Sequence, residues 1–145
     1  MTENPLLIRP FLQVASICER HILEPDGTLT LFRIFDRFMI SGPAEEMPAT
    51  ALSFTFILKL ASGPVRGKLA VKLTPLDISL QPMQSVTIPA LFEGDDERSA
   101  VLIGQMRMEV KDEGLYWITV EIEGTEYTRV PLRVVYQRSP TVLPG

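Results

Sequence analysis

Side chains able to carry chemistry are scarce in this sequence. Its 145 residues include one cysteine, Cys18, and one histidine, His21. A single cysteine cannot form an internal disulfide, and a zinc site needs several cysteine, histidine or carboxylate ligands that converge. A serine triad would have to use His21 as its base, and no Gly-x-Ser-x-Gly motif is present. We therefore expect neither a transition-metal site nor a triad.

Cys18 and His21 also make a poor nucleophile and base pair. Residues three apart on a strand point to opposite faces of the sheet, so the two side chains should diverge. Free cysteine is usually buried as a small apolar residue. We predict that Cys18 is a core residue and that His21 lies at the surface or rim, and we assign no catalytic, cofactor-binding or metal-binding residue.

Other missing features disfavour several classes of partner. The chain has no Gly-x-Gly-x-x-Gly motif and no glycine-rich loop ending in Lys-Ser/Thr, which removes the common nucleotide sites. Its formal net charge of −4 gives no basis for nucleic-acid binding. No apolar run approaches the ~20 residues that span a bilayer, and Met1–Pro5 lacks the basic and apolar regions of a signal peptide. Together with the lone cysteine, these features favour a cytoplasmic protein without membrane contact.

What the chain does contain is apolar alternation with a period of two, which predicts half-buried antiparallel strands. In residues 50–60 the inward side chains are Leu52, Phe54, Phe56, Leu58 and Leu60, and in residues 116–122 they are Tyr116, Ile118, Val120 and Ile122. About eight such strands, spaced roughly 8–12 residues apart, are typical of a sandwich. We predict a single all-β domain over residues 1–145, an antiparallel β-sandwich, with residues 137–145 as an irregular tail.

The first third of the chain is harder to interpret. Residues 10–23 indicate a strand that is buried on both faces or broken by a bulge. The Pro-Asp-Gly turn within residues 24–28 predicts a hairpin between the first two strands. Residues 28–40 have apolar side chains at helical spacing as well, but their three phenylalanines and their position after a turn favour a strand.

The segment Asp112-Glu113-Gly114-Leu115-Tyr116 resembles the Asp-x-Gly-x-Tyr corner of immunoglobulin-like domains. That resemblance implies an immunoglobulin-like sandwich in which Tyr116 bonds to upstream backbone. Ile118 stands where an antibody domain has its second cysteine, so the likeness is to the architecture and not to antibodies. Together with the segments Ala15–Glu19, Pro25–Gly27 and Val130–Val134, the corner also resembles a family of small uncharacterised bacterial proteins, which implies no activity or site.

Three groups of side chains are candidates for contacts. Trp117 should lie on the face opposite Tyr116, beside Thr119 and near Arg133, where either its own chain or another subunit covers it. The carboxylates of Glu93, Asp95, Asp96 and Glu97 offer oxygens to calcium, although charged loops are usually solvated. Arg66, Lys68 and Lys72 line one strand face, where they meet an acidic partner or simply discourage aggregation.

The leading hypothesis is a non-catalytic sandwich that contacts another protein or forms a homo-oligomer. The alternative is a sandwich that binds a ligand or cation with the acidic loop of residues 93–98. A third hypothesis, an acid/base enzyme, stays open because paired carboxylates need no linear motif.

Overall fold

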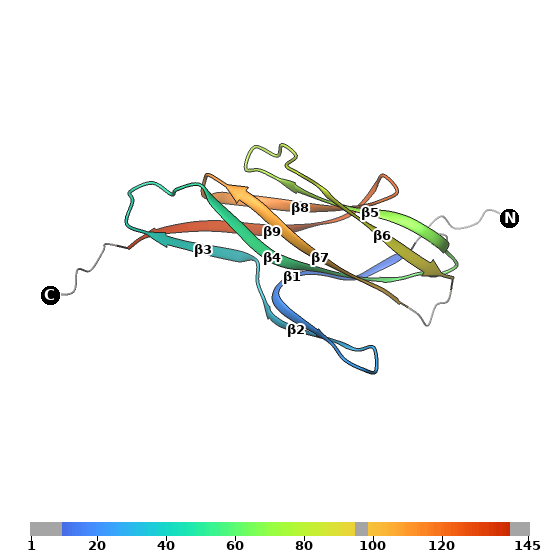
Figure 1. Ribbon diagram of the computed structural model, residues 1–145. Coiled ribbons are helices and arrows are strands. Elements are labelled where there is room, and N and C mark those ends of the chain that lie inside the picture. Colours follow the sequence, from blue (N-terminus) through green and yellow to red (C-terminus); the bar gives the residue numbers. More distant parts are fainter. Residues whose placement is uncertain (1–9, 95–98, 140–145) are drawn as a thin grey trace.

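The structure is a computed structural model that describes residues 10–94 and 99–139. Over these residues the fold has nine strands and no helix (Figure 1). The strands are β1 (Phe11–Leu23), β2 (Leu29–Ile34), β3 (Arg37–Gly42), β4 (Thr50–Ala61), β5 (Arg66–Leu76), β6 (Val86–Glu93), β7 (Ser99–Val110), β8 (Gly114–Ile122) and β9 (Thr125–Arg138). No helix long and apolar enough to cross a membrane occurs in this described part.

The strands form two sheets that pack face to face. One sheet has the order β2-β1-β4-β7, and the other has the order β3-β9-β8-β5-β6. All neighbours pair antiparallel except β3 and β9, which run parallel from the pair Arg37 and Arg133 to the pair Gly42 and Arg138. The predicted all-β sandwich is confirmed, with nine strands in place of about eight. The immunoglobulin-like arrangement of the strands stays a prediction.

The core fills the space between the sheets, as the alternation predicts. The fully buried side chains of β4 that face inward are Phe56, Leu58 and Leu60. Opposite them, the other sheet contributes Val71, Leu73, Ile118, Val120 and Leu132. Burial of such side chains stabilises the fold by roughly 1.5–3 kcal/mol each. The four predicted inward residues of β8, from Tyr116 to Ile122, are all buried.

Gly104, in the middle of β7, lies where the two sheets approach each other closely. A Cβ atom at this position would stand 3.2 Å from Ile88 Cδ1 and 3.3 Å from Leu73 Cδ1. Both of these side chains come from the opposite sheet. The missing side chain therefore makes the room that Ile88 and Leu73 occupy.

The hairpin of β8 and β9 is anchored at its start by a tyrosine corner. The Tyr116 hydroxyl donates a 2.7 Å hydrogen bond to the carbonyl oxygen of Asp112, and Tyr116 is buried. The turn between β8 and β9 lies at Glu123 and Gly124, which both have positive φ. The predicted tail is partly wrong, because Gln137 and Arg138 belong to β9 and pair with β3. Residues 140–145 lie outside the described residues.

Residues 28–40 form strands, as predicted, but not one strand. The chain extends along the first sheet as β2, then leaves it at Phe35 and Asp36 to start β3 in the second sheet. Arg33, with φ of 53°, has a left-handed backbone that bends the end of β2. Phe35 and Phe38 pack against the core after this crossing.

The predicted hairpin of β1 and β2 is confirmed, and so is the irregularity in β1. The pairing of β1 with β4 shifts register between Leu12 and Val14. The turn after β1 is closed by the Gly27 N–H, which donates a 2.9 Å hydrogen bond to the Glu24 carbonyl oxygen. Gly27 has φ of 87°, which glycine adopts without strain.

Candidate functional site

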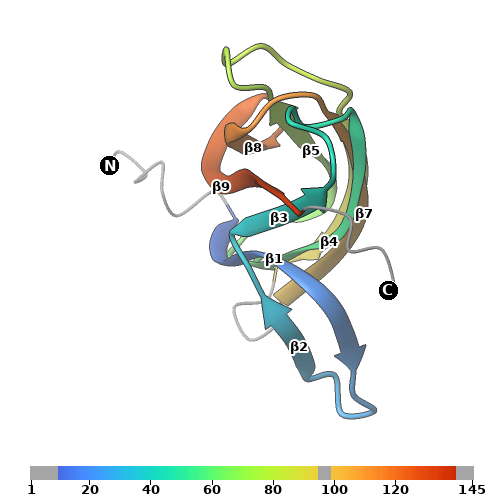
Figure 2. The same ribbon diagram turned by 90° about the vertical axis from the view of Figure 1, so that its left-hand side faces the viewer.

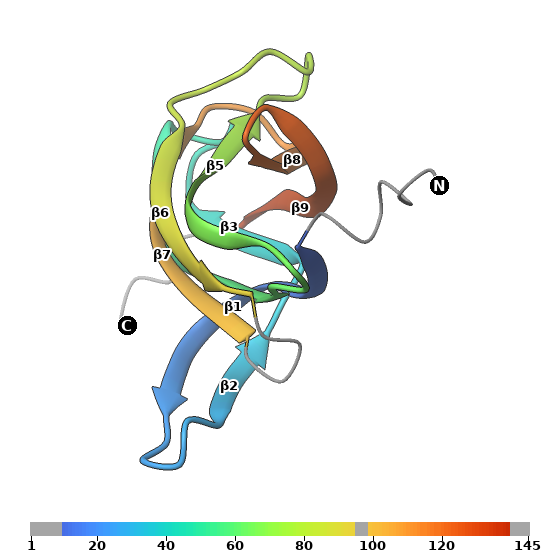
Figure 3. The same ribbon diagram turned by 90° about the vertical axis from the view of Figure 1, so that its right-hand side faces the viewer.

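The most unusual feature of the molecule is the distal part of the first hairpin, residues 19–34, which we call the hairpin arm. The arm extends away from the packed sheets in both side views (Figure 2, Figure 3). Among the described residues, its strand β2 pairs with β1 alone and forms one edge of its sheet. No described strand therefore bonds to the backbone N–H and C=O groups on the other edge of β2.

The arm is rich in apolar side chains that do not serve the core. Ile22 is 46% exposed, Leu23 58% and Ile34 61%, while three further apolar residues of the arm are half-buried, namely Leu29, Leu31 and Phe32. None of these six, all within the described part of the chain, belongs to the core or packs against it. A monomer gains nothing from exposing such a group of side chains, and contiguous apolar patches usually mark interaction sites.

The register of the hairpin divides these residues between two faces. On one face, Arg20 pairs with Phe32, and its guanidinium lies 4.8 Å from the centre of that ring. The other face, which we call the leucine face, carries the pairs His21 with Leu31 and Leu23 with Leu29. The phenylalanine on the first face is thus partly covered by its own arginine, whereas Leu23 on the leucine face stays largely exposed.

An aromatic cleft of about 420 Å³ opens at the base of the arm. Its lining residues are Glu19, Arg33, Phe35, Arg37, Phe38, Met39, Ser53 and Phe54. The rings of Phe35 and Phe38 meet edge to face with centroids 5.0 Å apart, and Phe54 lies 6.3 Å from Phe38. Phe54 is buried, whereas Phe35 and Phe38 are half-buried, so these two rings offer most of the apolar contact area to a side chain that enters from outside.

Charged side chains surround the aromatic cleft. Arg33 Nε lies 3.2 Å from Glu19 Oε2, so these two charges neutralise each other at the surface. Arg37 is exposed and has no ion pair with any residue that the structure describes. The cleft therefore combines an aromatic wall with one uncompensated cation.

Sequence reasoning did not identify the arm or the cleft. It treated residues 10–23 and 28–40 as strands of the body, because apolar side chains normally indicate burial. A signal was present in the sequence, since apolar residues occur on both faces of the predicted hairpin.

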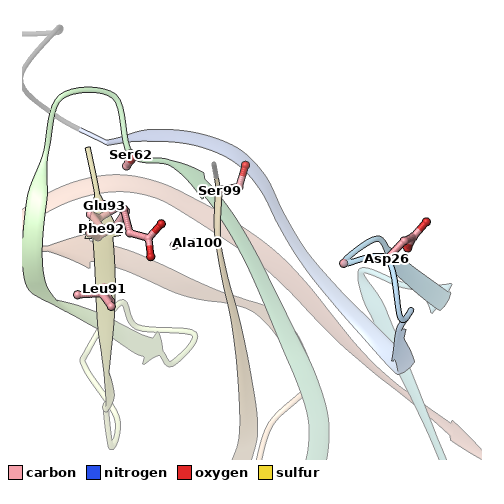
Figure 4. A pocket seen from close by; sticks show the side chains of 8 residues that line it. Asp26, Ser62, Leu91, Phe92, Glu93, Ser99 and Ala100 are labelled. Carbon is pink, nitrogen blue, oxygen red and sulfur yellow. The ribbon is translucent and has the colours of Figure 1, made fainter. Parts of the chain in front are cut away.

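A second hollow, of about 610 Å³, separates the tip of the arm from the ends of β6 and β7 (Figure 4). The Asp26 carboxylate accepts hydrogen bonds from the Thr28 N–H at 3.0 Å and the Thr28 hydroxyl at 2.6 Å. These bonds lower the pKa of Asp26. Figure 4 shows Asp26 across an open gap from Glu93, with its oxygens turned away from that side. The two carboxylates therefore do not converge.

The structure describes only part of the acidic loop on which the calcium hypothesis depends. Asp95, Asp96, Glu97 and Arg98 lie outside the described residues, so the acidic loop stays a prediction. Within the described ranges, no group of three or more His, Cys, Asp or Glu side chains is placed to hold a metal ion.

Cys18 and His21 lie as the strand geometry predicts. Cys18 pairs with Ile34 and Thr55 on one face of its sheet, and His21 is half-buried on the leucine face. Cys18 is fully buried, as expected, but it lies outside the core between the sheets. Burial raises the pKa of its thiol. A thiol that stays protonated is a weak nucleophile, which is the opposite of an activated cysteine.

Trp117 lies on the outer face of the second sheet, with Leu76 and Pro131 as its partners on the neighbouring strands. Arg133 lies two positions along β9 from Pro131, opposite Leu115, as the sequence suggested. Trp117 is half-buried. Strand β3 belongs to this same sheet and does not lie over the face of Trp117, so it does not cover the ring. Whether another subunit covers the ring stays a prediction.

The basic residues Arg66, Lys68 and Lys72 are all exposed on β5. Lys68 pairs with Leu91, and Arg66 pairs with Glu93 across the strands. Because these side chains face solvent, an acidic partner could reach them. That partner stays a prediction.

These features define a two-sheet, all-β sandwich protein with a projecting apolar hairpin. The chain belongs to a protein family of unknown function (DUF6941), whose sequence profile matches residues 13–135. Membership of an uncharacterised family is thereby confirmed, whereas a bacterial origin stays a prediction. A comparison with curated proteins finds no match.

Proposed function

We propose that this protein is a non-catalytic module that associates with a second copy of itself through the hairpin arm. The observation that carries this proposal is the group of six apolar side chains on the arm, none of which contributes to the core. Burial of these side chains against another copy would stabilise the complex through the hydrophobic effect, which the monomer does not gain from them.

The backbone of β2 supports association through strand pairing. Its outer edge can pair antiparallel with β2 of the second copy, which is how an edge strand commonly recruits another chain. A two-fold axis perpendicular to the sheet relates the two copies in this arrangement, so the interface is closed and stops at a dimer. The two four-stranded sheets would then become one continuous sheet of eight strands.

The proposed non-catalytic role rests on how the potentially reactive groups are placed. Cys18 and His21 occupy opposite faces of β1, and burial keeps the thiol protonated. The net charge of −4 favours a protein partner over nucleic acid. A buried lone cysteine also fits the reducing, cytoplasmic setting that we include in this proposal, together with a bacterial source.

Light scattering coupled to gel filtration tests the proposal. We expect the wild type to reach twice the 16.2 kDa of one chain at micromolar concentration. The double variant Leu23→Lys/Ile34→Lys places charges on both faces of the arm and should stay monomeric. A matched control is Leu80→Lys/Leu91→Lys, because Leu80 and Leu91 are 57% and 61% exposed, like the two arm residues. A wild type that is monomeric at every concentration would refute self-association.

A further inference from the structure

We infer that the aromatic cleft at the base of the arm binds the tip of the hairpin arm of a second copy. This inference rests on the proposed self-association. It adds a contact between the tip of each copy and the cleft of the other. The tip, with Leu23, Leu29 and Asp26, would fit against the wall of Phe35, Phe38 and Phe54, so that each copy supplies one tip and one cleft.

Antiparallel pairing brings these two parts together. If the pairing of β2 with its copy is centred on Leu31 or Phe32, residues before Leu29 in one copy lie beside residues after Ile34 in the other. The turn at the tip then lies next to the segment from Phe35 to Phe38, which forms the cleft.

The faces of the arm also agree with this arrangement. Glu19 and Arg33 line the cleft and form an ion pair, and their positions in the strands put them on the leucine face. A two-fold axis perpendicular to a sheet leaves each face of the sheet on the same side. The leucine face of the second copy therefore lies on the side where the cleft opens, and Leu23 and Leu29 are placed to enter it.

The charges at the two ends of the arm are complementary. The tip carries the carboxylates of Glu24 and Asp26, and Asp26 is exposed. At the other end, Arg37 lines the cleft and lacks an ion-pair partner among the described residues. Antiparallel pairing places Asp26 of one copy near Arg37 of the other. Because of the two-fold symmetry, the dimer contains two such contacts.

The size of the surface gives a further reason for including the cleft. Stable complexes bury about 800 Å² per partner with roughly 20–30 residues on each side. The arm has sixteen residues, and six lining residues of the cleft lie outside the arm, which gives a surface of twenty-two residues. The cleft therefore adds six residues to the sixteen of the arm, which brings the candidate surface into the range of residue numbers seen in standard interfaces.

Charge reversal in the full chain tests the contact between copies. Alone, Asp26→Arg and Arg37→Asp should each weaken self-association about tenfold, because each homodimer then contains two like-charge contacts. An equimolar mixture of the two variants should form heterodimers about as tightly as the wild type, because every contact in the mixed dimer is again attractive. Asp26→Asn keeps an acceptor for the Thr28 bonds and should give a smaller loss. Arg107→Asp, on an exposed position of β7, is the control.

Sedimentation velocity of each variant and of the mixture separates the outcomes. Recovery of dimer in the mixture supports the contact between tip and cleft, because no effect within one chain can produce it. If the wild type dimerises and Leu23→Lys/Ile34→Lys abolishes the dimer, but the mixture shows no recovery, the tip does not meet the cleft and the inference is wrong while self-association stands. If the wild type is a monomer throughout, both fail together.

Discussion

The Tyr116 hydroxyl and the Asp112 carbonyl oxygen are joined by a 2.7 Å hydrogen bond at the entrance of β8. Tyr116 is buried, and its bond to Asp112 is partly buried, so removal of the hydroxyl takes away a bond that water replaces less readily than at an exposed site. We expect Tyr116→Phe to lower the free energy of unfolding by about 1–2 kcal/mol in urea denaturation. The comparison is Tyr136→Phe, because Tyr136 donates an equally short bond to the Ala44 carbonyl oxygen in a more exposed place. An equal loss in both variants would contradict the role of burial.

The fold should also lose stability at high pH. Burial raises the pKa of the Cys18 thiol above its usual 9.0 and the pKa of the Tyr116 phenol above its usual 10.0. A raised pKa in the folded state adds stability that is complete below the unfolded pKa and disappears as the pH rises through the folded pKa. Urea midpoints should therefore fall from about pH 9 upward.

The variant Cys18→Ala/Tyr116→Phe removes both of these groups. It is expected to be less stable at neutral pH but to show a flatter dependence of the urea midpoint above about pH 9. If its midpoint declines as steeply as that of the wild type, other groups cause the alkaline loss.

Gly104→Val tests the close approach of the two sheets. The new side chain would collide with Ile88 and Leu73, whose terminal carbons already lie 3.2 Å and 3.3 Å from a Cβ at this position. Overpacking of this kind costs about 1–3 kcal/mol in unfolding free energy. Arg107→Val changes an exposed residue of the same strand and should be nearly neutral. A thermal midpoint that is equally unaffected in both variants would show that the sheets separate easily at Gly104.

The arm should contribute little to the stability of one chain. At concentrations where the wild type is monomeric, Leu23→Lys/Ile34→Lys should change the unfolding free energy by no more than about 0.5 kcal/mol. Phe56→Ala, at a fully buried position of β4, should cost about 3–5 kcal/mol by comparison. A large loss in the arm variant would mean that the arm packs on its own sandwich.

The strands of the body could be predicted because their environment repeats along the chain. In β4 and β8, every second side chain meets the same core, so a period of two in the sequence reports the burial directly. The corner at Tyr116 was also predictable, since the hydrogen bond joins residues only four positions apart.

The parts that escaped sequence reasoning depend on contacts between distant segments. The crossing at Phe35 and Asp36 depends on the pairing of β3 with β9, which lies almost a hundred residues later in the chain. No local sequence pattern encodes this pairing. Leu29 and Leu31 alternate like core residues, yet within the described part of the chain they neither belong to the core nor pack against it. The aromatic cleft joins side chains from β3 and β4 with the arm, so only the folded chain brings it together.

Hydrogen–deuterium exchange in the segment Leu29–Ile34 tests the central claim most directly, because it reports the state of the β2 edge itself. The measurement compares samples below and above the concentration at which the chain associates, with β9 as the internal reference. We predict that amides of β2 exchange more slowly in the concentrated sample while those of β9 do not change. Exchange in β2 that is the same at both concentrations, in a sample shown to be dimeric at the higher one, would contradict pairing through the arm.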